Sequence, residues 1–229
     1  MRTISLALLL ALATGCGAAP STAPDPAPAP APMACATERP TGTLDTKVLY
    51  QTEMDYPPFD TPEALAREAA ELVVVGRVTG WLPGPVIEEI PDSRTYHVLL
   101  RVRVERRLKG SSAEVIHFPY HQGALLSARK PFQDEKDFER AVPTGTRVLL
   151  FLKTARPSGY PVVEDRAGLP PGTPDYAAAP QGVVLHEVGP DGRGRAVGGR
   201  TEMLALAGWD EPCGIDGLVA RLEANGFTG

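Results

Sequence analysis

The chain lacks the short motifs by which most catalytic and nucleotide-binding sites are recognised in a sequence. Its 229 residues contain no His-Glu-x-x-His, no Gly-x-Ser-x-Gly, no Walker sequence and no dinucleotide-binding glycine pattern. The sequence therefore identifies no residue as a catalytic nucleophile. We expect a protein that is not an enzyme and that holds no cofactor.

A strong net charge of either sign is also absent. The formal net charge is −5 and the isoelectric point is about 5.4, which argues against nucleic acid as a partner. Four arginines lie between positions 101 and 107, and Glu105 and Glu114 balance them locally. We interpret this cluster as the solvated face of a strand.

No apolar run is long enough to span a bilayer as a helix. The longest, residues 4–13, follows Arg2 near the start of the chain, whereas a membrane-spanning helix needs about 20 residues. A basic residue followed by a short apolar segment is typical of a signal peptide, which we assign to residues 1–15.

The residues after the apolar run resemble the lipobox of bacterial lipoproteins. They read Leu12-Ala13-Thr14-Gly15-Cys16, with a small residue before the cysteine. The resemblance implies that Cys16 receives diacylglycerol and palmitate-type chains and becomes the first residue of a lipoprotein anchored in the bacterial cell envelope. The sequence departs from the family at Ala13, where leucine is preferred. Ordinary signal-peptidase cleavage nearby is the alternative.

A linker and one folded domain are expected after Cys16. Residues 16–34 are rich in proline and alanine and contain nothing that could form a core, so we predict a semi-rigid spacer in polyproline II conformation. Residues 35–229 are predicted to form a single domain. Of three cysteines, Cys35 and Cys213 remain for this domain. In an oxidising compartment they are expected to form a disulfide, and two free thiols are the alternative.

The segment 94–110 carries the clearest structural pattern. From Tyr96 to Val104 every second residue is apolar, which predicts a half-buried strand so long that it must bend or coil. The pattern predicts a helix at Thr61–Leu72 with Thr61 as its N-cap, and a bulge or crossing point at Gly76 in the strand that follows. Further predicted strands are Val73–Trp81, Glu114–Tyr120, Thr146–Lys153, Tyr160–Glu164 and Gly182–Val188, and further predicted helices are Thr201–Leu206 and Asp216–Ala224, the latter capped by Asp216.

These elements predict a mainly β protein. We expect a small five-stranded barrel of the oligonucleotide/oligosaccharide-binding (OB) type, or a β-sandwich, with one helix on its N-terminal side and helices at its C-terminus.

The order of elements from residue 62 to 155 resembles a loose group of exported bacterial domains. These are similar to the OB-like barrel of tissue inhibitors of metalloproteinases and netrin-type modules. The segments that carry the resemblance are Glu71–Val78, the long strand ending at Gly110 and Pro143–Leu152. Inhibition in that family uses a free N-terminal cysteine. Cys16 would be acylated and Cys35 lies within the chain, so this role is not transferred.

Two long connections, residues 120–145 and 155–182, are the candidates for a binding surface, because loops of this length in a compact domain are commonly functional. Their aromatic residues Phe132, Phe138, Tyr160 and Tyr176 are predicted to form it. The alternative is that these rings cover the ends of the barrel as part of the core.

The histidines offer a weaker candidate. His117 and His121 flank Pro119 and could contribute to a metal site, but their spacing is not diagnostic. We favour surface or hydrogen-bonded histidines and expect no metal.

The sequence as a whole favours a lipid-anchored exported protein of the cell envelope. We expect a non-catalytic module that binds a protein or glycan and contacts the membrane through its anchor. Two alternatives stay open, a protease-inhibitor-like module and a secreted hydrolase without a recognisable motif.

Overall fold

The computed structural model describes residues 35, 42–50, 57–91, 93–123, 125–127, 130–155, 160–199 and 202–229. They belong to one compact unit, Ala34–Gly229. The predicted signal peptide and linker, with Cys16, lie outside the described residues.

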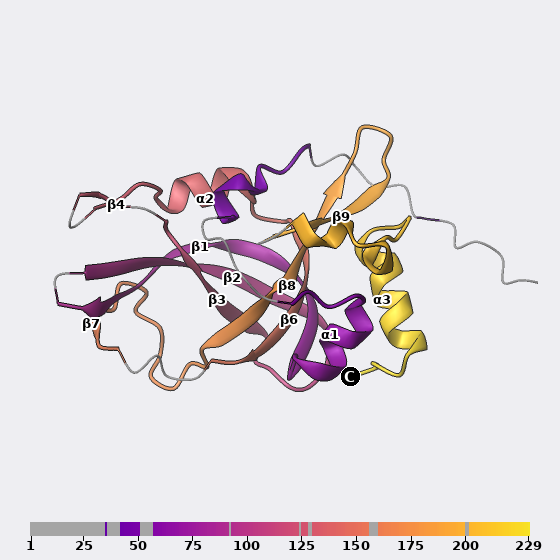
Figure 1. Ribbon diagram of the computed structural model, residues 1–229, viewed down its shortest axis with the longest axis horizontal. Coiled ribbons are helices and arrows are strands. Elements are labelled where there is room, and N and C mark those ends of the chain that lie inside the picture. Colours follow the sequence, from indigo (N-terminus) through magenta and orange to yellow (C-terminus); the bar gives the residue numbers. More distant parts are fainter. Residues whose placement is uncertain are drawn as a thin grey trace, which may run out of the picture. The chain divides into compact units, whose positions relative to one another are not determined.

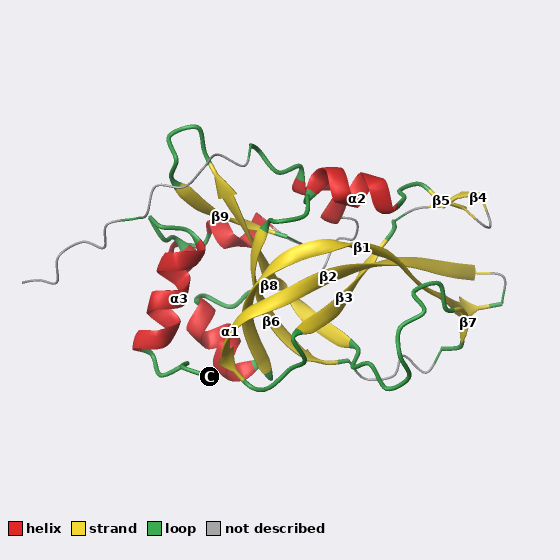
Figure 2. Ribbon diagram, turned by 180° about the vertical axis from the view of Figure 1, so that it is seen from behind, coloured by secondary structure: helices red, strands yellow, loops and turns green. Residues whose placement is uncertain are grey.

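The described part of the chain is mainly β, with three α-helices and short 3-10 turns (Figure 1; coloured by type in Figure 2). In chain order the elements are η1 (Thr46–Leu49), α1 (Pro62–Glu68), β1 (Leu72–Ile90), β2 (Ser93–Lys109), β3 (Val115–His121), β4 (Leu125–Ser127), β5 (Lys130–Pro131), α2 (Glu135–Ala141), β6 (Arg147–Thr154), β7 (Val162–Glu164), β8 (Tyr176–Val188), β9 (Gly194–Gly198), η2 (Glu202–Ala205), η3 (Ala207–Trp209) and α3 (Ile215–Ala224).

Seven strands form one antiparallel sheet in the order β3-β2-β1-β6-β8-β9, with β7 paired to the outer part of β1. Strands β4 and β5 form a separate small ladder. Among the described residues no ladder joins the edge strands β3 and β9, so the sheet is open. The mainly β class predicted from the sequence is confirmed, but the described strands form an open sheet of seven strands and not the closed five-stranded barrel. Hydrophobic alternation locates strands, but it contains no information on whether the two edges of a sheet meet.

The hairpin of β1 and β2 is the longest element, with strands of 19 and 17 residues. The register shifts five times along this pair, and one shift falls between Val75 and Gly76. Such bulges bend and twist strands, which confirms that the long strand bends. A Cβ atom on Gly76 would lie 2.4 Å from the carbonyl oxygen of Arg103. Only glycine fits there, and the register shift at this residue confirms the predicted bulge.

One face of the sheet carries the larger core. Alternate residues of β1, β2, β3, β6 and β8 meet there, and η1 and α2 contribute to it. Trp81 packs against Tyr120 and Phe138, with ring centroids 5.5 and 5.1 Å away. The indole of Trp81 also donates a hydrogen bond to the carbonyl of Val142, over 3.0 Å. This bond satisfies the polar atom of a buried ring.

The opposite face is covered at one end by α1 and α3, which lie side by side (Figure 1). Thr61 caps α1 through its side chain, as predicted, but the helix ends at Glu68 because Leu72 already begins β1. The predicted cap of α3 is wrong. Gly214 precedes that helix, and Asp216 lies in its first turn, where it forms an ion pair with Arg147 at 2.6 Å.

A disulfide joins Cys35 to Cys213, as predicted, with Cα atoms 5.2 Å apart. It fastens the start of the compact unit to the turn before α3 and closes a loop of 178 residues. Loops of this size give a chain-entropy stabilisation of up to about 5 kcal/mol.

Arg221 of α3 connects the C-terminal helix to α1. Its guanidinium donates two hydrogen bonds to Glu63, at 3.0 and 2.9 Å, and one to Glu211 at 2.9 Å. It also reaches the carbonyl of Gly208. Burial alone would lower the pKa of Arg221, but its hydrogen bonds to the two carboxylates outweigh this effect and raise it. The charged form is therefore the one that the fold stabilises.

Replacing Arg221 by glutamine should lower the free energy of unfolding by about 2 kcal/mol, because it leaves the buried carboxylate of Glu63 without its partner. Urea denaturation followed by circular dichroism measures the change. Arg193→Gln is the matched control, because Arg193 is four-fifths exposed and its contact with Asp191 is long, at 3.8 Å. Equal stability of the two variants would show that the network does not hold α1 to α3.

Candidate functional site

The end of the β1–β2 hairpin lies away from α1 and α3 (Figure 1). Strand β7 pairs with β1 there, with Val162 opposite Ile87 and Glu164 opposite Val86. The small β4–β5 ladder is found at the same end of the sheet (Figure 2). We call the described residues of 86–97, 125–132 and 160–175 the hairpin end.

Large hydrophobic side chains are exposed at the hairpin end. Phe132 is 66% exposed and Ile90 is 64% exposed. Among the side chains that the structure describes, every exposed large hydrophobic belongs to this region. They are Ile90, Leu125, Phe132, Tyr160, Val162 and Val163. Single exposed hydrophobics are ordinary, but their concentration in one region is typical of an interaction surface.

The four aromatic residues predicted for a binding surface divide into two pairs. Phe132 and Tyr160 are exposed at the hairpin end. Phe138 and Tyr176 are buried in the larger core, as the alternative interpretation described. Phe138 lies on the side of α2 that faces Trp81, and the sequence of a seven-residue helix did not show which side would face the sheet.

Ile90, Leu125, Val162 and Val163 were not predicted to belong to the surface. Leu125, Val162 and Val163 belong to short apolar stretches, which normally indicate buried strands, and Ile90 is a single apolar residue between Glu89 and Pro91. Their pairing explains the exposure. β7 has only three residues, all exposed, and joins the sheet where the hairpin extends past its neighbours.

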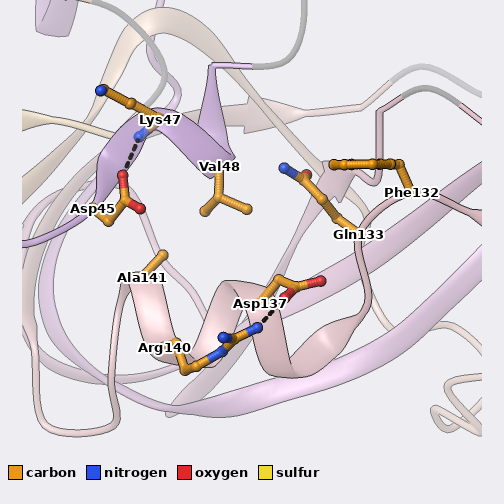
Figure 3. A pocket seen from close by; sticks show the side chains of 8 residues that line it. All are labelled: Asp45, Lys47, Val48, Phe132, Gln133, Asp137, Arg140 and Ala141. Atoms are coloured by element: carbon orange, nitrogen blue, oxygen red, sulfur yellow. Dashed lines mark hydrogen bonds and ion pairs between the residues drawn. The ribbon is translucent and has the colours of Figure 1, made fainter.

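A groove of about 540 Å³ adjoins Phe132 between η1 and α2 (Figure 3). Val48 and Ala141 provide apolar side chains, and charged residues of both signs stand around them. The lining residues are Asp45, Lys47, Val48, Phe132, Gln133, Asp137, Arg140 and Ala141. Arg140 forms an ion pair with Asp137 one turn earlier in α2. Mixed charges around an apolar floor suit a polypeptide segment better than a uniformly charged polymer.

Arg166 ties the hairpin end to the rest of the sheet. Its guanidinium donates hydrogen bonds to the carbonyls of Gly84 and His97 and to the side-chain oxygen of Gln122, at 2.9, 2.8 and 2.8 Å. It also stands 5.5 Å from the ring centroid of Tyr96. Gln122 is itself buried and donates to the carbonyl of Gln133, before α2. One side chain thus fixes the connection after β7, the hairpin and the approach to α2.

The Arg166→Gln variant should loosen the hairpin end without unfolding the domain. Loss of these charged hydrogen bonds should destabilise the region locally by about 2 kcal/mol and speed amide exchange roughly 30-fold in residues 84–97 and 165–175. Hydrogen–deuterium exchange by mass spectrometry measures this. The matched control is Arg94→Gln, which removes one 3.4 Å contact with Glu164. Similar exchange in both variants would show that Arg166 does not position the hairpin end.

The two candidate metal ligands do not meet in one cluster. His117 and His121 lie on the same face of β3, four residues apart. The ring of His121 contacts that of His97 across the strands, with centroids 5.5 Å apart, and its Nδ1 accepts a hydrogen bond from the amide of Gly123. In the described part of the chain no three His, Cys, Asp or Glu side chains lie close enough to hold a metal.

Cys16, the predicted lipidation site, lies outside the described residues. The disulfide between Cys35 and Cys213 indicates that the domain matures in an extracellular or otherwise oxidising compartment. None of the helices in the described ranges is long and apolar enough to cross a membrane.

Comparison with known proteins adds no assignment to this geometry. No protein-family model matches the chain, and no curated protein or solved structure is significantly similar to it. Functional inference therefore rests on the side chains themselves.

Proposed function

We propose that the protein is an exported, non-catalytic binding module that contacts a protein of the cell envelope through its hairpin end. The exposure of six large hydrophobic side chains in that one region carries the proposal. The centres of protein interfaces are enriched in aromatic residues and depleted in charged ones. Phe132 and Tyr160 supply exposed rings of the kind that act as interface anchors.

A protein fits these features better than a glycan. The exposed residues include the aliphatic Ile90, Val162 and Val163 as well as the rings, and aliphatic surface is buried favourably against other apolar side chains. The groove beside Phe132 has apolar and charged positions that could receive a segment of such a partner. The network around Arg166 would hold the surface in place before binding, which reduces the entropy lost on association.

The membrane anchor belongs to the same proposal. Leu12–Cys16 has the pattern of a lipobox, and a proline-rich linker separates it from Cys35. Acylation at Cys16 would place the module on a bacterial envelope membrane, with the linker as a spacer. We also propose that the domain is related to netrin-type and metalloproteinase-inhibitor domains. The order of a helix, a long hairpin and later strands supports this relation.

The anchor is tested by the intact mass of the full-length protein extracted from membranes. We expect a chain that begins at Cys16 and carries two or three acyl chains, with Cys35 and Cys213 unreactive toward alkylation until they are reduced. Cys16→Ser should remove the acyl mass and release the protein from the membrane fraction, because the proposed attachment depends on the two or three acyl chains at this residue. An unacylated chain with another start would contradict the anchor but not the binding surface.

The binding surface is tested by the double substitution Phe132→Ser and Val162→Thr in the full-length protein. Native gel analysis of mildly solubilised membranes should show the wild type in a complex and the variant at its own mass. Anchor residues of this kind contribute more than about 1 kcal/mol each, so affinity should fall at least about tenfold.

The control for this test is Lys153→Ser with Arg193→Ser, two exposed positions outside the hairpin end. It should keep the complex, and thermal melts should show both double variants folded. A complex of unchanged mass in the Phe132/Val162 variant would contradict the proposed surface.

A further inference from the structure

A second surface lies on the face of the sheet that α1 and α3 cover only in part. Along β2, Leu108 is buried beneath the helices and Arg106 forms an ion pair with Glu223 of α3. Farther along, Leu99 is buried and lines a pocket with residues 165–173. Between these two covered positions Arg101 and Arg103 are exposed. The intervening stretch of sheet is therefore an uncovered strip, about 20 Å along the strand, flanked by a helix and a loop.

Neighbouring strands bring more positive side chains to this strip. Arg103 lies directly opposite Arg77 of β1, and Arg77 lies directly opposite Arg147 of β6. Arg101 lies opposite His117 of β3. Residues directly opposite one another in an antiparallel sheet point to the same face. We call Arg77, Arg101, Arg103 and His117 the arginine window, with Arg147 at its border.

Only part of this charge is neutralised within the domain. Arg77 binds Glu105 at 2.8 Å and the carbonyl of Gly145 at 3.2 Å, and Arg147 binds Asp216. In the ranges that the structure describes, neither Arg101 nor Arg103 forms a salt bridge. Glu114, which precedes β3, is exposed, and its main-chain carbonyl accepts a hydrogen bond from the amide of Val104.

The histidine does not add a positive charge near neutral pH. Burial, and then the charge of Arg101, lower the pKa of His117 below its ordinary value of 6.5. The window is therefore a purely arginine-based positive patch on a chain whose net charge is −5. Like charges directly opposite one another destabilise a sheet. In the row of Arg147, Arg77 and Arg103 the first two are ion-paired, so Arg103 is the member whose charge stability alone does not favour.

We propose that the arginine window binds an extended anionic polysaccharide. Guanidinium groups match carboxylate and phosphate oxygens in geometry and form charge-assisted hydrogen bonds with them. A single polymer strand can lie along the strip between α3 and the 165–173 loop, across the exposed side chains of Arg101 and Arg103. The oxidising compartment indicated by the disulfide is one in which acidic glycans, and not nucleic acids, are the common polyanions. This surface is separate from the hairpin end and does not depend on the function proposed for it.

The experiment uses the full-length protein in detergent, with polygalacturonate as a carboxylate polymer and pullulan as a neutral one. Isothermal titration calorimetry at low and moderate salt should show binding to polygalacturonate that weakens as salt rises, and no binding to pullulan. The double variant Arg101→Gln, Arg103→Gln should bind about tenfold or more weakly, because it removes the two unpaired guanidinium groups.

The matched control is Lys153→Gln with Arg193→Gln, which removes the same charge from exposed positions outside the window. It should bind within about twofold of the wild type. Equal losses in the two double variants would show an effect of net charge and overturn the proposal, as would the absence of polygalacturonate binding to the wild type. Flotation with phosphatidylglycerol vesicles forms a third arm, with the Cys16→Ser protein to exclude the proposed anchor. Flotation that depends on Arg101 and Arg103 would assign the window to a lipid surface and overturn the polysaccharide.

Discussion

The pairing of β1 with β2 is the constraint on which the rest of the structure depends. The two strands stay paired from Val73 and Lys109 at one end to Ile90 and Ser93 at the other, with bulges that bend the ribbon between these ends. At the first end both faces are covered, one by the larger core and the other by α1 and α3. At the second end the ribbon extends to where only short strands and loops adjoin it. One hairpin thus belongs to the packed core at one end and carries an exposed surface at the other.

This arrangement explains how exposed apolar side chains are tolerated. A long two-stranded ribbon is weakly stable by itself, yet here it is continuous with the core and braced by Arg166 from the connection after β7. The same ribbon carries the arginine window midway along its length, on the face that α1 and α3 partly cover. The window lies there between these helices and the connection after β7. The two proposed surfaces therefore differ in chemistry and in place, although both are built on β2 and its neighbours.

Much of the fold could be predicted because its causes are local. The alternation from Tyr96 to Val104 identified β2, the Thr61–Pro62 pair identified the start of α1, and the position of two cysteines predicted the disulfide. Non-local features could not be predicted in this way. β9 is a five-residue strand with glycine at both ends and has no alternating pattern, and the open edge of the sheet depends on pairing across distant segments.

The candidate sites show the same limit. The sequence placed Phe132 and Phe138 together in one loop, but α2 turns Phe138 into the core and leaves Phe132 at the rim of the groove. The arginines near position 103 looked balanced by acids close in sequence. In the structure Glu105 is occupied by Arg77, which belongs to another strand, so Arg101 and Arg103 keep their charge. The packing of α2 decides the first outcome and register across strands decides the second, and a single sequence contains neither.

The central claim is that the hairpin end is the surface that meets a partner. The most direct measurement places a photo-crosslinking amino acid, one position at a time, at Ile90, Tyr160 and Val163 of the hairpin end and at Lys153 and Arg193 outside it, in the living cell. The account predicts crosslinks to one discrete protein from the first three positions and none from the other two. Crosslinks from Lys153 and Arg193 with none from the hairpin end would contradict it.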